Sequence, residues 1–293
     1  MKILAVDLGK ARTGLAVCDE GEILASPVAV ITQYNREKLA QEVAAKAREL
    51  AVGELVVGLP RNMDGSEGES AQGAREFAAV LGELTGLPVV LRDERLSRHT
   101  TYRIGGPAAL FVAAHSYAAL ARTVAVLAAE HVDWVIIGKG SNLLVSDRGY
   151  DGCVITLDDE FSRIAIGDDG SVTVGAGAAL SKVVNEALKA GLSGLEFCVG
   201  IPGTAGGAIS MDAGTRHEWI GRRVRDLVVL RPGEGLHRYQ GSDVEWGYRS
   251  TSIPTSEIIL EATLALEPGS RAEITADMEE RLRRRREAQP LGA

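Results

Sequence analysis

Cysteine is scarce in this sequence, and its placement is as informative as its rarity. The three cysteines, Cys18, Cys153 and Cys198, lie far apart, and no Cys-x-x-Cys pair or Cys/His cluster occurs. A disulfide framework and a cysteine-based zinc site are therefore not supported. Each thiol lies in an apolar stretch, which predicts three buried, reduced side chains.

Long apolar runs are also missing. After Lys2, only Ile3–Val6 is apolar before Asp7, which is far too short for the core of a signal peptide. No other apolar run approaches the length of a membrane span. We therefore expect a cytoplasmic protein with no membrane partner.

Positive charge is in deficit as well. The 32 Lys and Arg residues against 40 Asp and Glu give a formal net charge of −8, which argues against a broad basic surface that coats nucleic acid. A metal-dependent nuclease stays open, because carboxylates hold the ion that meets the phosphate in such enzymes. The 293 residues, 45% hydrophobic and 25% charged, are enough for two globular domains.

The first third of the sequence alternates strand-like runs with helical spacing. Asn35 is a typical N-cap, and apolar residues recur every three or four positions after it and again around Phe77–Leu84. A polar, glycine-rich loop is expected at Asn62–Ser70. The expected strands are Ile3–Val6, Gly14–Cys18, Ile23–Val30, Leu55–Gly58 and Pro88–Leu91. This order predicts a small α/β domain over residues 1–97.

The character of the sequence changes near Arg98. Ser116 and Ser181 are expected to cap helices, and Gly191 is expected to end the second of them. The expected strands are Ala109–Ala113, Trp134–Ile137, Cys153–Leu157, Arg163–Ile166, Ser171–Val174, Leu227–Arg231 and Ile258–Leu266. Many short strands with few helices predict an α+β domain over residues 98–293.

The sequence from Arg271 onward predicts a final helix, with five arginines among positions 281–286. Such a run can bind an anionic ligand, but a solvated helix face is the favoured interpretation.

Three glycine-rich turns follow apolar strands in the second domain: 138–142 (GKGSN), 175–178 (GAGA) and 200–207 (GIPGTAGG). Glycine lets backbone N–H groups turn toward an anion, so such turns form nests for phosphate oxygens. Tight turns alone explain a single Gly-x-Gly pair equally well. Three in one short span favour a phosphate-bearing cofactor. None is a Gly-x-Gly-x-x-Gly or a Walker loop, so a Rossmann fold is not indicated.

Five ordered motifs in this domain resemble the UDP-N-acetylenolpyruvoylglucosamine reductase (MurB) family. They are His99–Ala108 (HTTYRIGGPA), Gly138–Asp147 (GKGSNLLVSD), Gly191–Phe197 (GLSGLEF), Ile201–Ile209 (IPGTAGGAI) and Gly247–Ser250 (GYRS). The resemblance covers roughly residues 98–290. It implies an FAD-binding fold of the vanillyl-alcohol-oxidase (PCMH) type, after an α/β ribonuclease-H-like domain considered below.

The resemblance also implies which residues bind FAD. Those expected around the pyrophosphate are Gly138, Gly140, Ser141 and Asn142, and Lys139 is also expected to bind the cofactor. Those expected toward the flavin or elsewhere along the cofactor are Gly175, Gly177, Ile201, Gly203, Thr204, Gly207 and Asp212. Asp212 stands where the family usually has asparagine, and a carboxylate accepts hydrogen bonds but does not donate as an amide does.

The family's reaction moves a hydride from NADPH to FAD and then to UDP-N-acetylglucosamine enolpyruvate, which gives UDP-N-acetylmuramate for peptidoglycan. Hydride addition pushes negative charge onto the substrate carboxylate, and a fixed guanidinium suits that charge. Arg249, in the Gly-Tyr-Arg-Ser motif, matches the arginine with this role. Tyr248 is expected to help bind the substrate.

Carboxylates end two predicted strands of the first domain. Asp7 follows the first strand, and Asp93 and Glu94 follow the fifth. Adjacent strand ends can bring such groups together to hold Mg²⁺ beside a phosphodiester, although solvated acidic strand ends are commonplace. On the residues alone, both interpretations stay open.

The surrounding motifs resemble the YqgF family: Ala5–Gly9, Arg12–Gly14, Val57–Pro60, Asn62–Gly68 and Asp93–Ser97. The resemblance implies a Holliday-junction-resolvase-like nuclease that acts on pre-16S ribosomal RNA or branched nucleic acid. Asp7 and Asp93 would be its catalytic metal ligands, with Glu94 as a helper and structured RNA or DNA as partner.

Both resemblances predict shortened domains. The YqgF family ends with a helix carrying a further acidic residue, which has no counterpart after Ser97. The reductase family continues into a substrate-binding domain with a Gly-Ser proton donor and a glutamate acid, which have no counterpart before Ala293.

Three functions therefore stay open. The FAD-dependent reductase is favoured, because its match is longer and keeps the cofactor motifs and Arg249. The alternatives are a metal-dependent nuclease of the YqgF type, and a non-catalytic fusion or fragment of a longer bifunctional chain.

Overall fold

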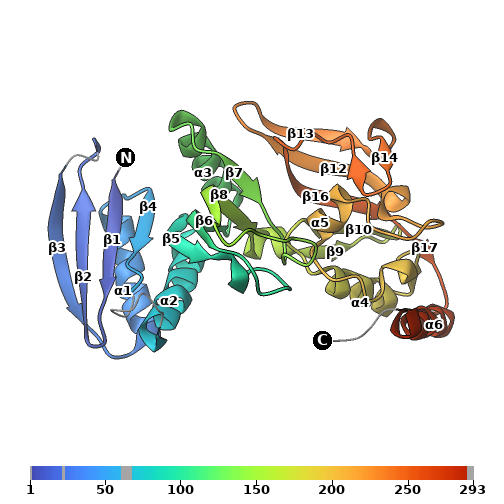
Figure 1. The fold of residues 1–293 in the computed structure, drawn as a ribbon, viewed down its shortest axis with the longest axis horizontal. Coiled ribbons are helices and arrows are strands. Elements are labelled where there is room, and N and C mark those ends of the chain that lie inside the picture. Colours follow the sequence, from blue (N-terminus) through green and yellow to red (C-terminus); the bar gives the residue numbers. More distant parts are fainter. Residues whose placement is uncertain (1, 22–23, 61–67, 289–293) are drawn as a thin grey trace. The chain divides into compact units, whose positions relative to one another are not determined.

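The computed structural model describes residues 2–21, 24–60 and 68–288 and divides the chain into two compact units (Figure 1). Unit 1 comprises residues 1–98, 103–136 and 145–156, and unit 2 comprises residues 99–102, 137–144 and 157–293. The chain therefore passes between the units several times. The units do not coincide with the stretches 1–97 and 98–293, and a domain boundary at Ser97 stays a prediction.

Unit 1 begins with a mixed sheet and two helices. Its strands are β1 (Ile3–Leu8), β2 (Arg12–Cys18), β3 (Ala25–Thr32), β4 (Glu54–Val57) and β5 (Val89–Arg95), and its helices are α1 (Arg36–Glu49) and α2 (Glu69–Thr85). β1, β2 and β3 are antiparallel neighbours, whereas β4 and β5 run parallel to β1. On β1, Leu4 and Val6 are buried and Ala5 and Asp7 are exposed, which is the alternation of a strand with one covered face.

The sheet continues past β5 into the second predicted domain. β6 (Pro107–Ala114) pairs antiparallel with β5, from Val89 opposite Ala113 to Arg95 opposite Pro107. Helix α3 (Tyr117–Ala129) then leads to β7 (Trp134–Ile136) and β8 (Tyr150–Leu157). The result is one eight-stranded sheet in the order β3-β2-β1-β4-β5-β6-β8-β7. β5 is therefore an interior strand with a partner on each side.

Unit 2 is built on an antiparallel sheet in the order β13-β12-β16-β10-β9. These strands are β9 (Ile164–Ile166), β10 (Ser171–Gly175), β12 (Val224–Arg231), β13 (Gly235–Gln240) and β16 (Ile258–Ala265). Two short pairs are β11 (Leu192–Ser193) with β17 (Glu267–Pro268) and β14 (Trp246–Gly247) with β15 (Ser250–Thr251). The helices are α4 (Leu180–Ala190), α5 (Ala205–Ser210) and α6 (Arg271–Ala288). Val172, Val184, Leu227 and Leu264 belong to their common core.

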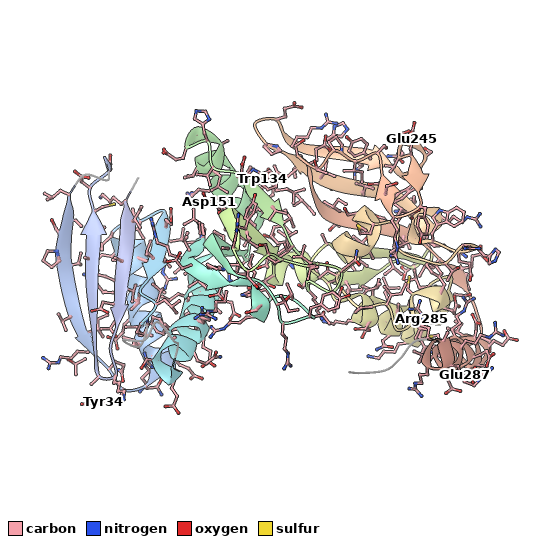
Figure 2. The ribbon with its side chains drawn as sticks, in the orientation of Figure 1. Tyr34, Trp134, Asp151, Glu245, Arg285 and Glu287 are labelled. Carbon is pink, nitrogen blue, oxygen red and sulfur yellow. The ribbon has the colours of Figure 1, made fainter. Side chains whose placement is uncertain are left out.

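Helix α6 carries the arginine run and docks on unit 2 through one face. Ile274 and Met278 are buried in the core. Arg283 pairs with Glu280 and Glu287, and Arg284 pairs with Glu280; Arg285 and Glu287 are labelled on this helix in Figure 2. Arg283, Arg284 and Arg286 therefore lie on an exposed face, as expected. Arg281 and Arg285 differ from the expectation, because they are half-buried and contact Glu218 and the Phe197 carbonyl. Of the helices that the structure describes, none is both long and apolar enough to cross a membrane.

The predicted helix ends can be compared with the structure directly. Asn35 and Ser116 cap α1 and α3, and their side chains accept hydrogen bonds from the N–H groups of Lys38 and Ala119. Gly191 ends α4 at φ +70°, as expected. Ser181 as an N-cap is wrong, because α4 begins at Leu180 after Ala179, which forms a β-bridge to Thr204.

Two expectations fall partly outside the described residues. Ile23, the predicted first residue of the third strand, lies outside the described residues. Most of the loop expected at Asn62–Ser70 also lies outside them. Ser70 itself lies in α2.

Candidate functional site

The first glycine turn of unit 2 offers a row of backbone donors. Gly140 is buried with φ +57°, and a Cβ there would overlap the carbonyl oxygen of His99. Its own carbonyl accepts a hydrogen bond of 3.1 Å from the Thr101 N–H. Within the described chain, the backbone N–H groups of residues 139–142 donate to no protein acceptor. Of these four residues Gly140 is buried. A buried backbone donor is nearly always paired, so the Gly140 N–H suits an external acceptor.

The second glycine turn lies directly against the first. A Cβ on Gly138 would lie 2.5 Å from Thr204 Oγ1, and a Cβ on Gly203 would lie 3.1 Å from Ser141 Oγ. Ser141 Oγ donates to the Pro202 carbonyl at 3.3 Å. We call residues 138–142 and 203–204 the paired turns. Only glycine at Gly138 and Gly203, the latter at φ +122°, lets the two backbones approach this closely.

The remaining predicted turn, residues 175–178, has another role. The N–H groups of Gly175 and Gly177 donate to the carbonyls of Arg163 and Phe161, at 2.9 and 2.8 Å. A Cβ on either residue would overlap a carbonyl oxygen, of Phe161 or Leu157. Their N–H groups are thus used inside the protein and are not available to a cofactor. These glycines let the end of β10 pack closely against the segment before β9.

The remaining glycine-cluster residues hold the second turn in place. Thr204 caps α5, and its Oγ1 accepts a hydrogen bond of 3.3 Å from the Gly207 N–H. The Ile201 N–H donates to the Cys198 carbonyl at 3.0 Å. Lys139 is exposed beside the turn. Among the described residues, Lys139 and Asn142 have no protein partner for their backbone N–H groups or their side chains.

Asp212, two residues after α5, is buried and has the left-handed φ of +40°. Its Oδ1 accepts a hydrogen bond of 2.9 Å from the Gly221 N–H. Burial raises the pKa of this carboxyl, and the hydrogen bond from Gly221 partly opposes that rise. The side chain that was expected to contact a cofactor therefore has a partner within the protein.

Arg249 and Tyr248 form the two-residue turn between β14 and β15. Arg249 has φ +60° and is exposed, and Tyr248 is 90% exposed. Arg249 has no acidic partner among the residues that the structure describes. β15 contacts α5, the helix that follows the second of the paired turns. This unpaired guanidinium is thus presented beside the glycine cluster.

The predicted metal-binding carboxylates of unit 1 do not lie together. Asp7 and Asp93 are both exposed, but β4 lies between β1 and β5, so their strands are about 10 Å apart. Glu94 is fully buried and pairs with Arg75. In the described ranges, no group of three His, Cys, Asp or Glu side chains is placed to hold a metal ion.

Several residues around this site were not singled out from the sequence. A Cβ on Gly221 would overlap the Trp246 ring, and Glu218 pairs with Arg281 at 2.7 Å. The Gly206 N–H donates to the Ala176 carbonyl at 2.8 Å. These contacts join segments far apart in the chain. Of these residues, Gly206 could have been recognised from the sequence, because it lies within the glycine-rich motif 200–207.

Comparison with family models divides the chain in two. Residues 1–104 match the Holliday junction resolvase family, and residues 108–234 match the FAD binding domain family. The predicted fold class, a ribonuclease-H-like domain followed by an FAD-binding domain, is confirmed by these matches.

Known relatives of most of the chain are reductases. The UDP-N-acetylenolpyruvoylglucosamine reductases of Heliobacterium modesticaldum and Bacillus licheniformis are 39% and 38% identical over 202 and 216 residues. These alignments cover 69% and 72% of this chain and 64% and 71% of the relatives. The crystal structure of the reductase from Thermus caldophilus is similar with a TM-score of 0.59 and 35% identity, over 69% of this chain and 70% of that one.

The chain belongs to the UDP-N-acetylenolpyruvoylglucosamine reductase family. It spans 64% of the Heliobacterium protein and 66% of a second such reductase from Symbiobacterium thermophilum.

Proposed function

We propose that this chain binds FAD and uses NADPH to reduce UDP-N-acetylglucosamine enolpyruvate to UDP-N-acetylmuramate. The observation that carries the proposal is the contact between the paired turns, which lie more than sixty positions apart in the sequence. Their free N–H groups are gathered beside the helix that contacts the Arg249 hairpin. Family membership supports the same reaction class.

The residues present fit a cofactor with a diphosphate. The N–H groups of residues 139–142 and of Gly203 and Thr204 donate to no acceptor in the described chain, and backbone amides in such turns bind phosphate oxygens. We infer that the paired turns hold the FAD pyrophosphate, with the Gly207 N–H bracing the second turn through Thr204 Oγ1. Asp212 instead bonds the Gly221 N–H. Gly175, Gly177 and Ile201 support the fold around it.

Arg249 would act on the substrate. FAD, when bound, supplies the hydride that NADPH has delivered. Hydride addition to the enolpyruvyl group leaves negative charge on the substrate carboxylate, and a guanidinium binds that charge with two parallel N–H donors. Arg249 has no carboxylate partner among the residues that the structure describes, so its charge is available to the substrate. Tyr248, on the same turn, is placed to contact the substrate.

The test replaces Arg249 by lysine, which keeps the charge and loses the fork. Turnover of UDP-N-acetylglucosamine enolpyruvate should fall by roughly 100-fold, the usual loss for a charge-stabilising donor, while NADPH alone still reduces the bound flavin. Arg238→Lys on β13 is the matched control and should keep wild-type turnover, since Arg238 pairs with Asp226. Equal turnover in the Arg249 and Arg238 variants, or no turnover in the wild type, would contradict the proposal.

A metal-dependent nuclease that acts on structured RNA or DNA is the second candidate, favoured by the resolvase match over residues 1–104. Asp7 and Asp93 would be its Mg²⁺ ligands, since both are exposed. Glu94 does not fit the helper role, because it is buried against Arg75. Magnesium-dependent cleavage of a branched DNA, absent when Mg²⁺ is chelated, would support this candidate.

A further inference from the structure

A closed loop follows α5 and is tied at both of its ends. We call residues 213–221 the α5 loop. At its base, Asp212 Oδ1 accepts from the Gly221 N–H at 2.9 Å, and the Ile220 N–H donates to the Ala213 carbonyl at 3.0 Å. A β-bridge joins Gly214 to Trp219. The loop therefore returns to the point where it starts.

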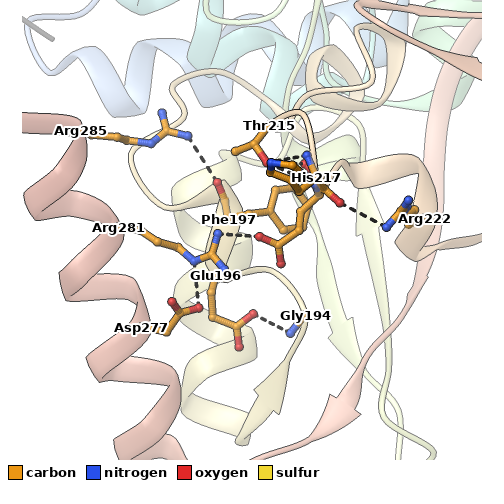
Figure 3. Close-up of polar contacts among 10 residues, drawn as sticks. Gly194, Glu196, Phe197, Thr215, His217, Arg222, Asp277, Arg281 and Arg285 are labelled. Atoms are coloured by element: carbon orange, nitrogen blue, oxygen red, sulfur yellow. Dashed lines mark hydrogen bonds and ion pairs between the residues drawn. The ribbon is translucent and has the colours of Figure 1, made fainter. Parts of the chain in front are cut away.

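The tip of the α5 loop is fixed to the last helix (Figure 3). Glu218 Oε2 pairs with Arg281 Nη1 of α6 at 2.7 Å, and Arg281 Nε also binds Asp277 at 2.8 Å. Thr215 Oγ1 accepts from the N–H groups of His217 and Glu218 and shapes the tip. Because α6 is anchored in the core of unit 2, Arg281 gives the loop a fixed support.

The far end of the α5 loop supports the Arg249 hairpin. The Trp246 ring lies so close to Gly221 that any Cβ there would overlap it. Trp246 Nε1 also donates to the Gly241 carbonyl at 2.9 Å, which fixes the ring. Trp246 is the first residue of β14, three positions before Arg249. A shift of Gly221 would therefore move the base of the turn that presents the guanidinium.

We propose that Asp212 and Arg281 are positioning residues for Arg249, which act by holding the α5 loop so that Gly221 supports Trp246. Neither residue needs to touch the substrate, because each acts through the loop and the indole ring. The importance of Arg249 for catalysis rests on the proposed function. The chain of contacts from Arg281 to Trp246 does not.

The test measures amide hydrogen exchange in the full chain. Arg281→Gln removes the support at the tip, and exchange in residues 213–221 and 246–251 should rise about threefold, in line with one partly exposed ion pair. Asp212→Ala leaves the Gly221 N–H without its acceptor, and the rise should be about tenfold. Asp212→Asn retains an acceptor oxygen, so exchange should stay within about twofold of wild type.

Arg284→Gln is the matched control on α6, because Arg284 pairs only within the helix, with Glu280. It should leave exchange unchanged in both segments. Exchanging the charges, Arg281→Glu with Glu218→Arg, should return exchange toward wild type. Faster exchange in the loop without faster exchange in 246–251 would overturn the proposal, as would no change in either segment with Arg281→Gln.

A kinetic measurement separates this proposal from the proposed function. Arg281→Gln should lower kcat for the enolpyruvyl substrate about threefold while FAD affinity and KM stay at wild-type values. A wild-type protein that never reduces the substrate would contradict the proposed function. Hydrogen exchange would still show whether Arg281 and Asp212 hold the α5 loop and the Arg249 hairpin in place. Wild-type kcat in Arg281→Gln would overturn the positioning role.

Discussion

Among single residues, the two buried thiols show how burial changes a side chain's pKa. Cys153 and Cys198 are 0% and 1% exposed, and burial raises the pKa of each to about 12. Coulombic repulsion from Glu54 adds to the rise at Cys153. Both stay protonated at neutral pH, and their burial agrees with the expectation. Cys18 was expected to be buried as well, but at the end of β2 it is only half-buried.

These thiols make the fold sensitive to alkali. Because the folded pKa is raised, their contribution to stability is present below the unfolded pKa of about 9 and is lost as the pH rises toward 12. Above pH 9, the free energy of unfolding should fall by about 1.4 kcal/mol per pH unit for each thiol. Urea denaturation at pH 8 and pH 10 checks this. The variant with Cys153→Ala and Cys198→Ala should lose less between the two pH values, and an identical loss would contradict the assignment.

Local signals fixed the helix caps and the glycine turns, but the roles of several residues depend on distant partners. Asn35 and Ser116 were predictable as caps because each side chain accepts a hydrogen bond from an N–H only three positions further along the sequence. Gly175 and Gly177 look like phosphate-binding glycines, yet their N–H groups face carbonyls before β9. Asp212 likewise bonds Gly221, nine residues on. No sequence pattern reveals which carbonyl a glycine faces.

At the level of elements, β5 is the structural link between the two family regions. The sequence predicted this strand and β6 separately, but strand pairing is not local, so their antiparallel register could not be read from it. β5 belongs to the stretch that matches the resolvase family, whereas most of β6 belongs to the stretch that matches the FAD binding domain family. The two matches therefore share one sheet.

A proline in β5 tests the shared sheet. Val90 pairs with Val56 on β4 and Val112 on β6. Val90→Pro removes a ladder hydrogen bond in the middle of the sheet and should destabilise unit 1 by about 1–3 kcal/mol. Hydrogen exchange should quicken together in β4 and β6. Val30→Pro on the edge strand β3 is the control and should cost less, because an edge strand has one partner only. Unaltered protection of β6 in Val90→Pro would show that the two strands are not paired.

For the molecule as a whole, the residues of the proposed flavin site lie in unit 2. The paired turns, α5, the α5 loop and the Arg249 hairpin all belong to it. Asp7 and Asp93 lie in unit 1, where no three-ligand metal cluster occurs among the residues described. This distribution, with the reductase relatives, is why the proposed reductase ranks above the nuclease.

Titration of the full chain with FAD tests whether the paired turns bind the cofactor. We expect one FAD per chain and roughly tenfold weaker binding in Gly203→Ala, whose Cβ would press on Ser141 at φ +122°. Gly233→Ala carries a similar backbone strain at φ +81°, but its Cβ meets nothing within 4 Å, so it should bind FAD as the wild type does. A chain that takes up no FAD, or a Gly203→Ala variant that binds it undiminished, would contradict the account.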